Sequence, residues 1–415
     1  MEPKVRLCGF KGQWVDVTLG EVGVFRSSGV DKKIYPNETM INLLNYMDVY
    51  NMRDITPMNC NTLMQVSASD KQIKECSVEK NDVFFTPTSE TAEDIGHVMV
   101  IKETLPNTCY SYHLMRYRPN PGIFAPYFPN WGFQTPFVRK QMYIGAKGVQ
   151  RMVLGRPEFE SLHVRIPSIE EQQSISSFFE NIETLISDSS SLLASLRKIR
   201  LASLQSMFPQ EGETIPKVRF KGFEGEWKKV LLSECLSVCK EKNIDNVYTK
   251  EDVLSVSDDF GICNQIKLLG RSYAGKSVAN YGILKNGDIV YTKSPLKVKP
   301  FGIIKTNHGK TGIVSTLYAI YSPKEGTCAD FIEVYFDLAE RLNKYIHPLV
   351  NKGAKNDMKV SSENALKGYI VLPSYEEQIK IAAYFASLDK LINLQSQRLE
   401  KLKNIKDSCL DKMFV

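Results

Sequence analysis

Residues 270–277 have the sequence GRSYAGKS, which matches the phosphate-loop pattern G-x-x-x-x-G-K-[ST] at every fixed position. In a working loop of this kind, backbone N–H groups and the start of a helix hold nucleotide phosphates, so a buried strand must precede it and a helix must follow. Here the preceding CNQIKLL is a poor buried strand, and Gly282 and the KNGD turn soon interrupt any helix. An accidental match is favoured, and nucleotide hydrolysis through Gly270–Ser277 remains only an alternative.

Other catalytic patterns are equally thin. The five histidines show neither H-E-x-x-H nor H-x-E spacing, and no G-x-S-x-G elbow occurs. NPGIF at 120–124 falls short of the Asn/Asp-Pro-Pro-aromatic tetrapeptide of adenine methyltransferases. Nine cysteines without a C-x-x-C pair predict reduced thiols in a cytoplasm and no metal site. The sequence therefore predicts a chain that is not an enzyme on its own, with no catalytic residues.

An internal repeat organises the chain. PKVRLCGFKGQW at 3–14 returns as PKVRFKGFEGEW at 216–227, PSIEEQ at 167–172 returns as PSYEEQ at 373–378, and MF at 207–208 returns at 413–414. Each half thus has a basic opening motif, a module of roughly 150 residues and a long helix. We predict an α+β protein in which two mixed α/β modules are joined by two long antiparallel helices that form a coiled coil with a pseudo-two-fold repeat. The predicted boundaries are module 1 at 1–166, helix 1 at 167–208, a linker at 209–215, module 2 at 216–372 and helix 2 at 373–415.

The two helices are predicted from apolar residues that recur in steps of three and four, the spacing of a coiled-coil seam. The proposed seam residues are Ile175, Phe178, Ile182, Leu185, Leu192, Leu196 and Ile199 in helix 1, and Ile381, Tyr384, Leu388, Leu391, Leu402 and Ile405 in helix 2. Ser189 and its repeat mate Gln395 interrupt the seam; a register-fixing polar layer and simple tolerance near solvent are both open.

Positive charge is concentrated within each module, although the net charge is only +6. No Asp or Glu occurs from Thr104 to Pro157, and residues 267–310 carry nine basic residues against one acid, Asp288. Basic surfaces with interleaved aromatic residues suit a phosphate backbone, because neutralised phosphates release counterions. The candidate DNA-binding residues are Arg116, Arg118, Arg139, Lys140, Lys147 and Arg151 in module 1, and Lys267, Arg271, Lys276, Lys293, Lys297, Lys299 and Lys355 in module 2.

The doubled PKVR…GFxGxW opening, the P-S-x-E-E-Q helix start and the paired helices resemble the specificity (S) subunit of type I restriction-modification systems. INLLNYMDVYN at 41–51 and GIVSTLYAIY at 312–321 look like pieces of that family's target-recognition domains. The resemblance covers essentially the whole chain. It implies that the two modules are target-recognition domains 1 and 2, that each reads half of an interrupted duplex DNA site, and that the helices are the central and C-terminal conserved regions.

The resemblance also implies partners: two methyltransferase (M) subunits docked on the helices, and restriction (R) subunits that join the complex. S-adenosylmethionine, ATP and magnesium would then bind those partners, with no cofactor in this chain and no membrane involved. Phe179 and Phe385 are candidates for contact with the M subunits, although ordinary coiled-coil packing explains them equally well. A DNA-binding coiled-coil scaffold without sequence preference is the other alternative. The bases that are read and the spacer length are not predicted.

Overall fold

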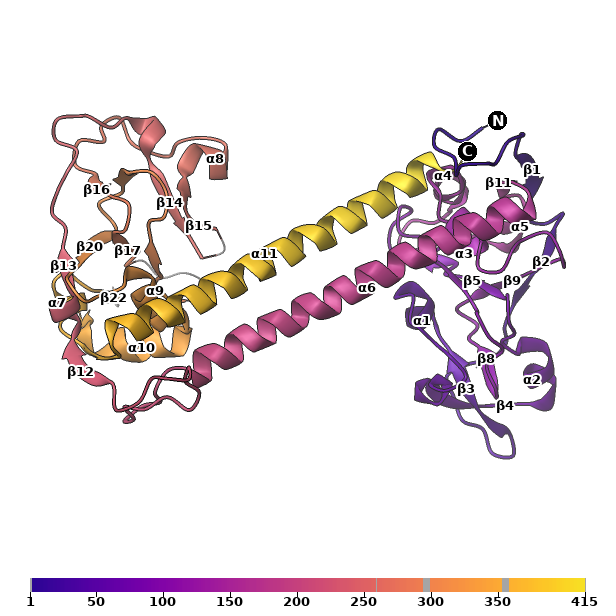
Figure 1. Ribbon diagram of the computed structural model, residues 1–415. Helices are drawn as coiled ribbons and strands as arrows, with labels where there is room; N and C mark the ends of the chain where they lie inside the picture. The colour runs from indigo at the N-terminus through magenta and orange to yellow at the C-terminus, as the bar shows by residue number, and fades with distance from the viewer. Residues whose placement is uncertain (1, 259, 294–298, 353–357, 415) are drawn as a thin grey trace. The chain divides into compact units, whose positions relative to one another are not determined.

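The chain folds into two compact units that share two long helices (Figure 1). The computed structural model describes residues 2–258, 260–293, 299–352 and 358–414. The first unit comprises Met1–Ser190 and Gln397–Val415, and the second comprises Ser191–Ser396. Helices α6 (Ile169–Ser206) and α11 (Tyr375–Lys412) have 38 residues each, and each begins in one unit and ends in the other.

The first unit is built around a four-stranded antiparallel sheet of order β2-β9-β5-β7 and a three-stranded sheet of order β4-β3-β8, in which β3 and β8 are parallel. Two strand pairs, β1 with β11 and β6 with β10, complete it. Its strands are β1 Val15–Thr18, β2 Gly23–Ser27, β3 Thr39–Leu44, β4 Met64–Ala68, β5 Val83–Phe85, β6 Thr88–Ser89, β7 Val98–Val100, β8 Thr108–Tyr110, β9 Met115–Pro119, β10 Met152–Val153 and β11 His163–Ile166. Its short helices are α1 Tyr46–Tyr50, η1 Cys60–Thr62, α2 Asp70–Cys76, α3 Pro129–Gly132, α4 Pro136–Gly145 and α5 Arg156–Glu160.

The second unit has a four-stranded antiparallel sheet of order β13-β20-β17-β18 and the strand pairs β12–β23, β14–β15, β16–β19 and β21–β22. Its strands are β12 Lys228–Leu231, β13 Leu236–Val238, β14 Leu254–Ser257, β15 Gly261–Asn264, β16 Gly282–Leu284, β17 Ile289–Tyr291, β18 Ile304–Thr306, β19 Gly312–Val314, β20 Ala319–Pro323, β21 Asn351–Lys352, β22 Met358–Lys359 and β23 Tyr369–Leu372. Its short helices are α7 Leu232–Cys235, η2 Lys250–Asp252, α8 Gln265–Leu269, α9 Ala329–Asp337, α10 Ala339–Ile346, η3 His347–Leu349 and η4 Asn364–Leu366.

The two units share a four-stranded antiparallel sheet and one equivalent strand pair. β1 pairs antiparallel with β11 from Val15↔Ile166 onward, just as β12 pairs with β23 from Lys228↔Leu372 onward. The central strands β5 and β17 come from the matching runs NDVFFT and GDIVYT, and all three residues of each strand are buried. Such short apolar runs suit strands covered on both faces. The predicted mixed α/β modules and their internal repeat are confirmed.

The opening motif of each half clasps the start of a long helix. The Arg6 guanidinium donates to both carboxylate oxygens of Glu171 at 2.8 and 2.7 Å, and Arg219 makes the same two bonds to Glu377 at 2.7 Å each. Both glutamates are almost fully buried. A paired Arg–carboxylate fork fixes orientation as well as charge, so the repeated PKVR and E-E-Q motifs are two halves of one contact.

The far end of each long helix packs on the opening motif of the module that it reaches. The Phe208 ring, just beyond α6, lies edge-on to Trp227 at 6.0 Å between ring centroids, and Phe414 lies edge-on to Trp14 at 5.9 Å. Equivalent backbone hydrogen bonds also occur in both units: Val218 N–H donates to Ser206 O, and Val5 N–H donates to Lys412 O. The repeated Met-Phe pairs therefore close the core of each unit.

Within each unit α6 and α11 run antiparallel. In the first unit, Lys406 Nζ lies 2.6 Å from Glu183 Oε1, while further toward the start of α6 Phe179 packs against Phe414. In the second unit, Arg200 pairs with Asp389, and Ser203 Oγ lies 2.9 Å from the Tyr384 hydroxyl. The residue number rises along one helix as it falls along the other, which confirms the predicted antiparallel coiled coil.

The seam follows a different set of residues from the predicted one. Ile175, Ile182, Ile381 and Leu388 are buried, and Phe178, Leu196, Tyr384 and Leu402 are half-buried. Five predicted positions are wrong, because their side chains are 42–53% exposed: Leu185, Leu192, Ile199, Leu391 and Ile405. After Ile182 the stripe of buried and half-buried residues instead passes through Ile186, Ser189, Leu193, Leu196 and Arg200, and in α11 through Leu388, Ile392, Gln395, Leu399 and Leu402.

The physical reason is that apolar residues are adjacent at 185–186 and at 192–193, so both steps of three and of four fit the sequence. The choice is made by the facing helix. At the position where Ile199 was expected, the seam takes Arg200, whose guanidinium reaches Asp389 and Asp337. Ser189 is buried and Gln395 is half-buried, so both polar residues do lie on the seam.

Candidate nucleic-acid interface

Three of the arginines predicted to contact DNA are engaged inside the first unit. Arg116 is 6% exposed and donates to the carbonyl oxygens of Glu75 and Ser77 at 3.3 and 3.2 Å, so its assignment to DNA is wrong. Arg118 forms a fork with the buried carboxylate of Asp82 at 2.7 and 2.9 Å. Buried carbonyls and carboxylates need donors, and these cations are therefore bound to the protein before any phosphate arrives.

Arg139 is similarly occupied. Its guanidinium donates to the carbonyl oxygens of Ile95 and, at 2.6 Å, of Glu93, and burial lowers its pKa from the ordinary value. Arg118 and Arg139 each keep part of their surface exposed, so a contact with DNA remains a prediction for them.

The three remaining candidate cations of the first unit lie on α4 or just after it. Lys140 is on α4 itself, and Lys147 and Arg151 follow in the loop that leads to β10. Lys147 Nζ pairs with Glu158 at 2.6 Å but its side chain is 79% exposed. These three positions have their charged ends at the surface, where a phosphate backbone would have to meet them.

Sequence reasoning missed a second exposed basic segment in this unit. Lys32 and Lys33 are exposed in the loop that leads to β3. The pKa of His113 is lowered by partial burial and by the positive charges of Lys32 and Arg151, which places these three side chains in one electrostatic neighbourhood. Asp31 adjoins the two lysines, so a search for acid-free segments does not find them. The adjacent lysines of the sequence D-K-K, in a loop, are the pattern that could have revealed this exposed basic segment.

In the second unit, the segment that resembles a phosphate loop has a different structure. It follows the helix α8, which ends at Gly270 in the left-handed conformation (φ 76°), and no helix follows Lys276 before β16. A nucleotide-binding loop needs the reverse order of strand and helix. The hydrolase alternative is therefore wrong, and Lys267, Arg271 and Lys276 are instead exposed side chains on a surface helix and loop.

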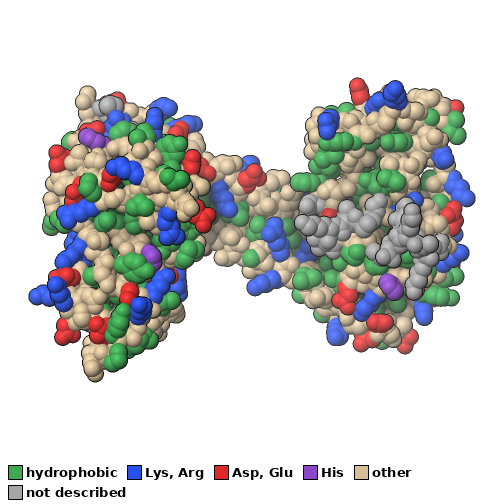
Figure 2. Space-filling view, turned by 180° about the vertical axis from the view of Figure 1, so that it is seen from behind, with side chains coloured by type: hydrophobic (Ala, Val, Ile, Leu, Met, Phe, Trp, Pro, Cys, Tyr) green, Lys and Arg blue, Asp and Glu red, His purple; other side chains and the backbone are tan. Residues whose placement is uncertain are grey.

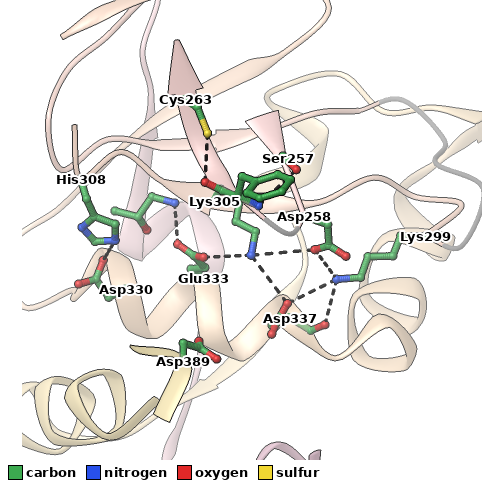
Figure 3. Close-up of polar contacts among 12 residues, drawn as sticks. Ser257, Asp258, Cys263, Lys299, Lys305, His308, Asp330, Glu333, Asp337 and Asp389 are labelled. Atoms are coloured by element: carbon green, nitrogen blue, oxygen red, sulfur yellow. Dashed lines mark hydrogen bonds and ion pairs between the residues drawn. The ribbon is translucent and has the colours of Figure 1, made fainter. Parts of the chain in front are cut away.

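Lys299 is bound within an ion-pair cluster of the second unit, as Figure 3 shows. Its ammonium lies 2.8 Å from Asp258 and 3.4 Å from Asp337, and only 16% of its side chain is exposed. Beside it, the buried Lys305 pairs with Glu333 at 3.2 Å. The assignment of Lys299 to DNA is wrong in this structure, because its charge is neutralised by acids that hold the β14–β15 hairpin, β18 and α9 together.

Asp337 is the centre of that cluster. Burial opposes ionisation of its carboxyl group, but the positive charges of Lys305, Arg200 and Lys299 outweigh burial and hold its pKa below the ordinary value. Arg200 reaches it from α6 at 2.7 Å. The cluster thus ties the long helix to the sheet of the second unit.

Of the remaining predicted cations, Lys293 is half-buried on a left-handed backbone (φ 52°), and burial lowers its pKa. Lys297 and Lys355 lie outside the described residues. Figure 2 shows Lys and Arg side chains over both units with Asp and Glu among them. On the face that this view draws, the cations are interspersed with acids, and we take the candidate interface as a set of particular exposed loops on each unit.

The two phenylalanines proposed for docking M subunits are core residues. Phe179 and Phe385 are both 0% exposed. Phe179 stacks on Trp131 with 5.0 Å between ring centroids, and Phe385 lies 6.1 Å from Phe208. A side chain without exposed surface has nothing to offer a partner, so this prediction is wrong and ordinary packing explains both residues.

The described part of the chain meets the requirements neither of a metal site nor of a membrane-spanning helix. Across residues 2–258, 260–293, 299–352 and 358–414, no group of three or more His, Cys, Asp or Glu side chains is placed to hold a metal ion. The nine cysteines are free thiols. Of the helices in these same stretches, none combines the length and the apolar content that crossing a membrane would require.

Comparison with known proteins gives a consistent result. The family described as "Type I restriction modification DNA specificity domain" matches residues 11–196. A relative from Methanocaldococcus jannaschii, named as the MjaX specificity subunit of a type I restriction enzyme, is 22% identical over 348 residues, covering 80% of this chain and 76% of the relative.

Solved structures share the fold. The S subunit of a type I restriction-modification system from M. genitalium matches 100% of this chain and 99% of its own, with a TM-score of 0.57 and 13% identity. A protein solved in work on complex assembly and conformational transition of the type I R-M system matches 97% of this chain and 98% of its own, with a TM-score of 0.50 and 15% identity. With the duplicated motifs and the repeated units, these matches identify residues 11–196 as similar to the type I restriction modification DNA specificity domain, and they show that the whole chain has the fold of type I S subunits.

Proposed function

We propose that each unit of this specificity subunit reads one half of an interrupted duplex DNA site, and that α6 and α11 set the distance between the halves. The observation that carries the proposal is the repetition of one four-stranded sheet, one Arg–Glu clasp and one interhelical ion pair in both units. A single polypeptide built in this way offers two recognition surfaces of related design. Specificity subunits are the non-catalytic members of their complexes, so methylation and cleavage would belong to the partners.

The phosphate contacts are proposed for exposed cations that have no strong internal partner. The candidates are Lys32, Lys33 and Lys140 in the first unit, and Lys267, Arg271 and Lys276 in the second. Contacts of this kind fix the position of a protein on DNA and supply affinity that falls with salt, while base contacts supply sequence preference.

A paired heptad deletion tests the spacing role. Removing 186–192 together with 396–402, which face each other in the antiparallel seam, keeps the seam in register. It shortens each helix by about 10 Å, or about three base pairs at 3.4 Å each. Binding to DNAs with a graded series of spacers should shift to a shorter spacer while both half-site sequences stay the same. An unchanged spacer preference would refute this role of the helices.

M subunits are proposed to dock on an apolar side of the coiled coil. The exposed residues Leu185, Ile199, Leu391 and Ile405 each precede a seam residue, and such positions face one another along one side of an antiparallel pair. The first unit then presents Leu185 beside Ile405, and the second presents their repeat mates Leu391 and Ile199. Exposed apolar surface at matching places is typical of a protein contact, and two matching places fit two M subunits.

Single charges at these positions test the docking. Leu185→Asp and Leu391→Asp should each reduce the complex from two M subunits to one, and the double variant should bind none, as measured by mass of the purified complex. Arg197→Ala, an exposed change on α6 away from this side, is the control. Two bound M subunits in the double variant would contradict the assignment.

The remaining parts of the proposal concern partners and place. S-adenosylmethionine would bind the M subunits, and ATP and magnesium the restriction subunits, in a cytoplasmic complex that also contains DNA. Competition distinguishes a scaffold without sequence preference. An excess of random duplex DNA should release the bound methylation site from such a scaffold, but it should not release that site from a specificity subunit.

A further inference from the structure

A short loop at the end of α4 projects from the first unit on a well-defined base. Lys147 and Val153 form an isolated β-bridge, with Lys147 N–H donating to Val153 O at 3.0 Å and Val153 N–H donating to Lys147 O at 2.8 Å. Immediately beyond, β10 pairs with β6 through Met152↔Ser89 and Val153↔Thr88. The loop 148–151 is thus held at both ends by backbone hydrogen bonds.

The conformation of this loop depends on Gly148. Its φ is +140°, and a Cβ atom at this position would lie 2.0 Å from the carbonyl oxygen of Arg151. Because a backbone atom cannot be moved aside as a flexible side chain can, only glycine permits this close approach. The tip is therefore presented in one shape that a single methyl group would disturb.

The tip carries Val149, Gln150 and Arg151, and all three are exposed, Val149 completely. Within the stretches of chain that the structure describes, neither the Gln150 amide nor the Arg151 guanidinium has a hydrogen bond or ion pair. This separates Arg151 from Arg116 and Arg118, whose donors are bound to carbonyl and carboxylate oxygens of the protein. The two polar ends and the valine on this braced loop are therefore available to contact another molecule.

The chemistry of the tip matches the edges of bases. Arginine binds guanine through O6 and N7, glutamine binds adenine through N6 and N7, and an apolar group contacts the thymine methyl. A cation that would hold a flanking phosphate lies close by, because Lys32 shares the electrostatic neighbourhood of Arg151 through His113. A protein partner would need acidic groups to meet this charge, whereas duplex DNA supplies phosphates and base edges together.

We propose that Val149, Gln150 and Arg151 form a base-reading site of the first unit, in which Arg151 recognises a guanine, Gln150 an adenine and Val149 a thymine methyl in the major groove. The site rests on the proposed function of the chain, since it names where one half of the DNA site is read. Lys32 positions the loop through a phosphate.

The test uses the full chain in its complex with M subunits and the DNA sequence that this complex methylates, mapped first. Each base of both half-sites is then varied in competition binding. Arg151→Lys keeps the charge but loses the two-pronged geometry, and Gln150→Ala removes the amide. Each should relax discrimination at one base pair of one half-site by about 5- to 150-fold, with the other half-site read as before. Arg156→Lys, on the neighbouring α5, is the matched control and should change neither half-site.

Gly148→Ala provides a second arm. It retains every reading side chain but changes the loop, so it should lose discrimination in the same half-site while binding to random DNA and its salt dependence stay the same. Unchanged base preferences in all three variants, or a uniform loss of affinity for every sequence, would overturn the base-reading assignment. If the unaltered complex shows no preference for any bipartite sequence, the proposed function itself fails, and the two failures are distinguishable.

Discussion

Replacing Phe385 with alanine separates its role in the core from the docking role that the sequence suggested. The side chain is 0% exposed, and its ring lies 5.2 Å from that of Tyr384 and 6.1 Å from that of Phe208. If the residue served only to bind an M subunit, Phe385→Ala would leave the folded chain as stable as before. If it closes the core of the second unit, the substitution destabilises that unit strongly.

The expected magnitude follows from burial. Removing a fully buried phenylalanine side chain forfeits about 2–3 kcal/mol of transfer free energy. The cavity that remains raises the usual cost to about 3–5 kcal/mol. Loss of the aromatic neighbours adds to this, so we expect a decrease of about 4 kcal/mol in the free energy of unfolding. For a unit of this size, that corresponds to a fall in Tm of about 8–16 °C.

Scanning calorimetry and urea unfolding of the full chain measure the effect. The second unit should melt earlier, while the transition of the first unit moves little. Leu391→Ala, six residues further along the same helix and 53% exposed, is the matched control and should change stability by less than about 0.5 kcal/mol. Phe179→Ala is the equivalent change in the first unit. A decrease below about 1 kcal/mol for Phe385→Ala would refute the core assignment.

Three further outcomes follow from the structure. Arg219→Ala should lower the free energy of unfolding, measured by urea titration, by about 2 kcal/mol, which is less than for a fully buried ion pair because Arg219 is partly exposed. Adding Glu377→Leu should recover part of this loss, and no recovery would contradict the Arg219–Glu377 contact. Burial raises the pKa of the Cys109 thiol to about 12. Iodoacetamide at pH 8 should therefore alkylate the exposed Cys8 long before Cys109, as measured by peptide mass analysis, and equal labelling of the two would argue against the burial of Cys109. The pKa of Asp337 lies below its ordinary 3.8, so the stability that its carboxylate contributes is present above about pH 4 and is lost as the pH falls through the folded pKa. As the pH is lowered, the urea midpoint of Asp337→Asn should therefore fall less steeply than that of the unaltered chain.

The repeated segments determined the architecture from sequence alone. Local signals were sufficient there, because PKVR, E-E-Q and Met-Phe occur twice in the same order, and because long runs of three- and four-residue steps specify helices wherever they occur. The structure adds what each motif does: the arginine clasps the glutamate, and the phenylalanine closes on the tryptophan. The predicted boundaries of the recognition domains stay a prediction.

Only the tertiary structure decided which side chains remain free. A charged residue in an acid-free stretch of sequence looks available, yet Arg116 and Lys299 meet their oxygen partners from segments that lie 38 or more residues away. The seam was undecided for the same reason: Leu185 and Ile186 are equally apolar, and only the facing helix determines which one is buried. Spacing along the chain therefore determined the helices and strands and their order. Which side chains can contact DNA or a partner was determined by burial and by ion pairing, because both depend on what folds against each residue.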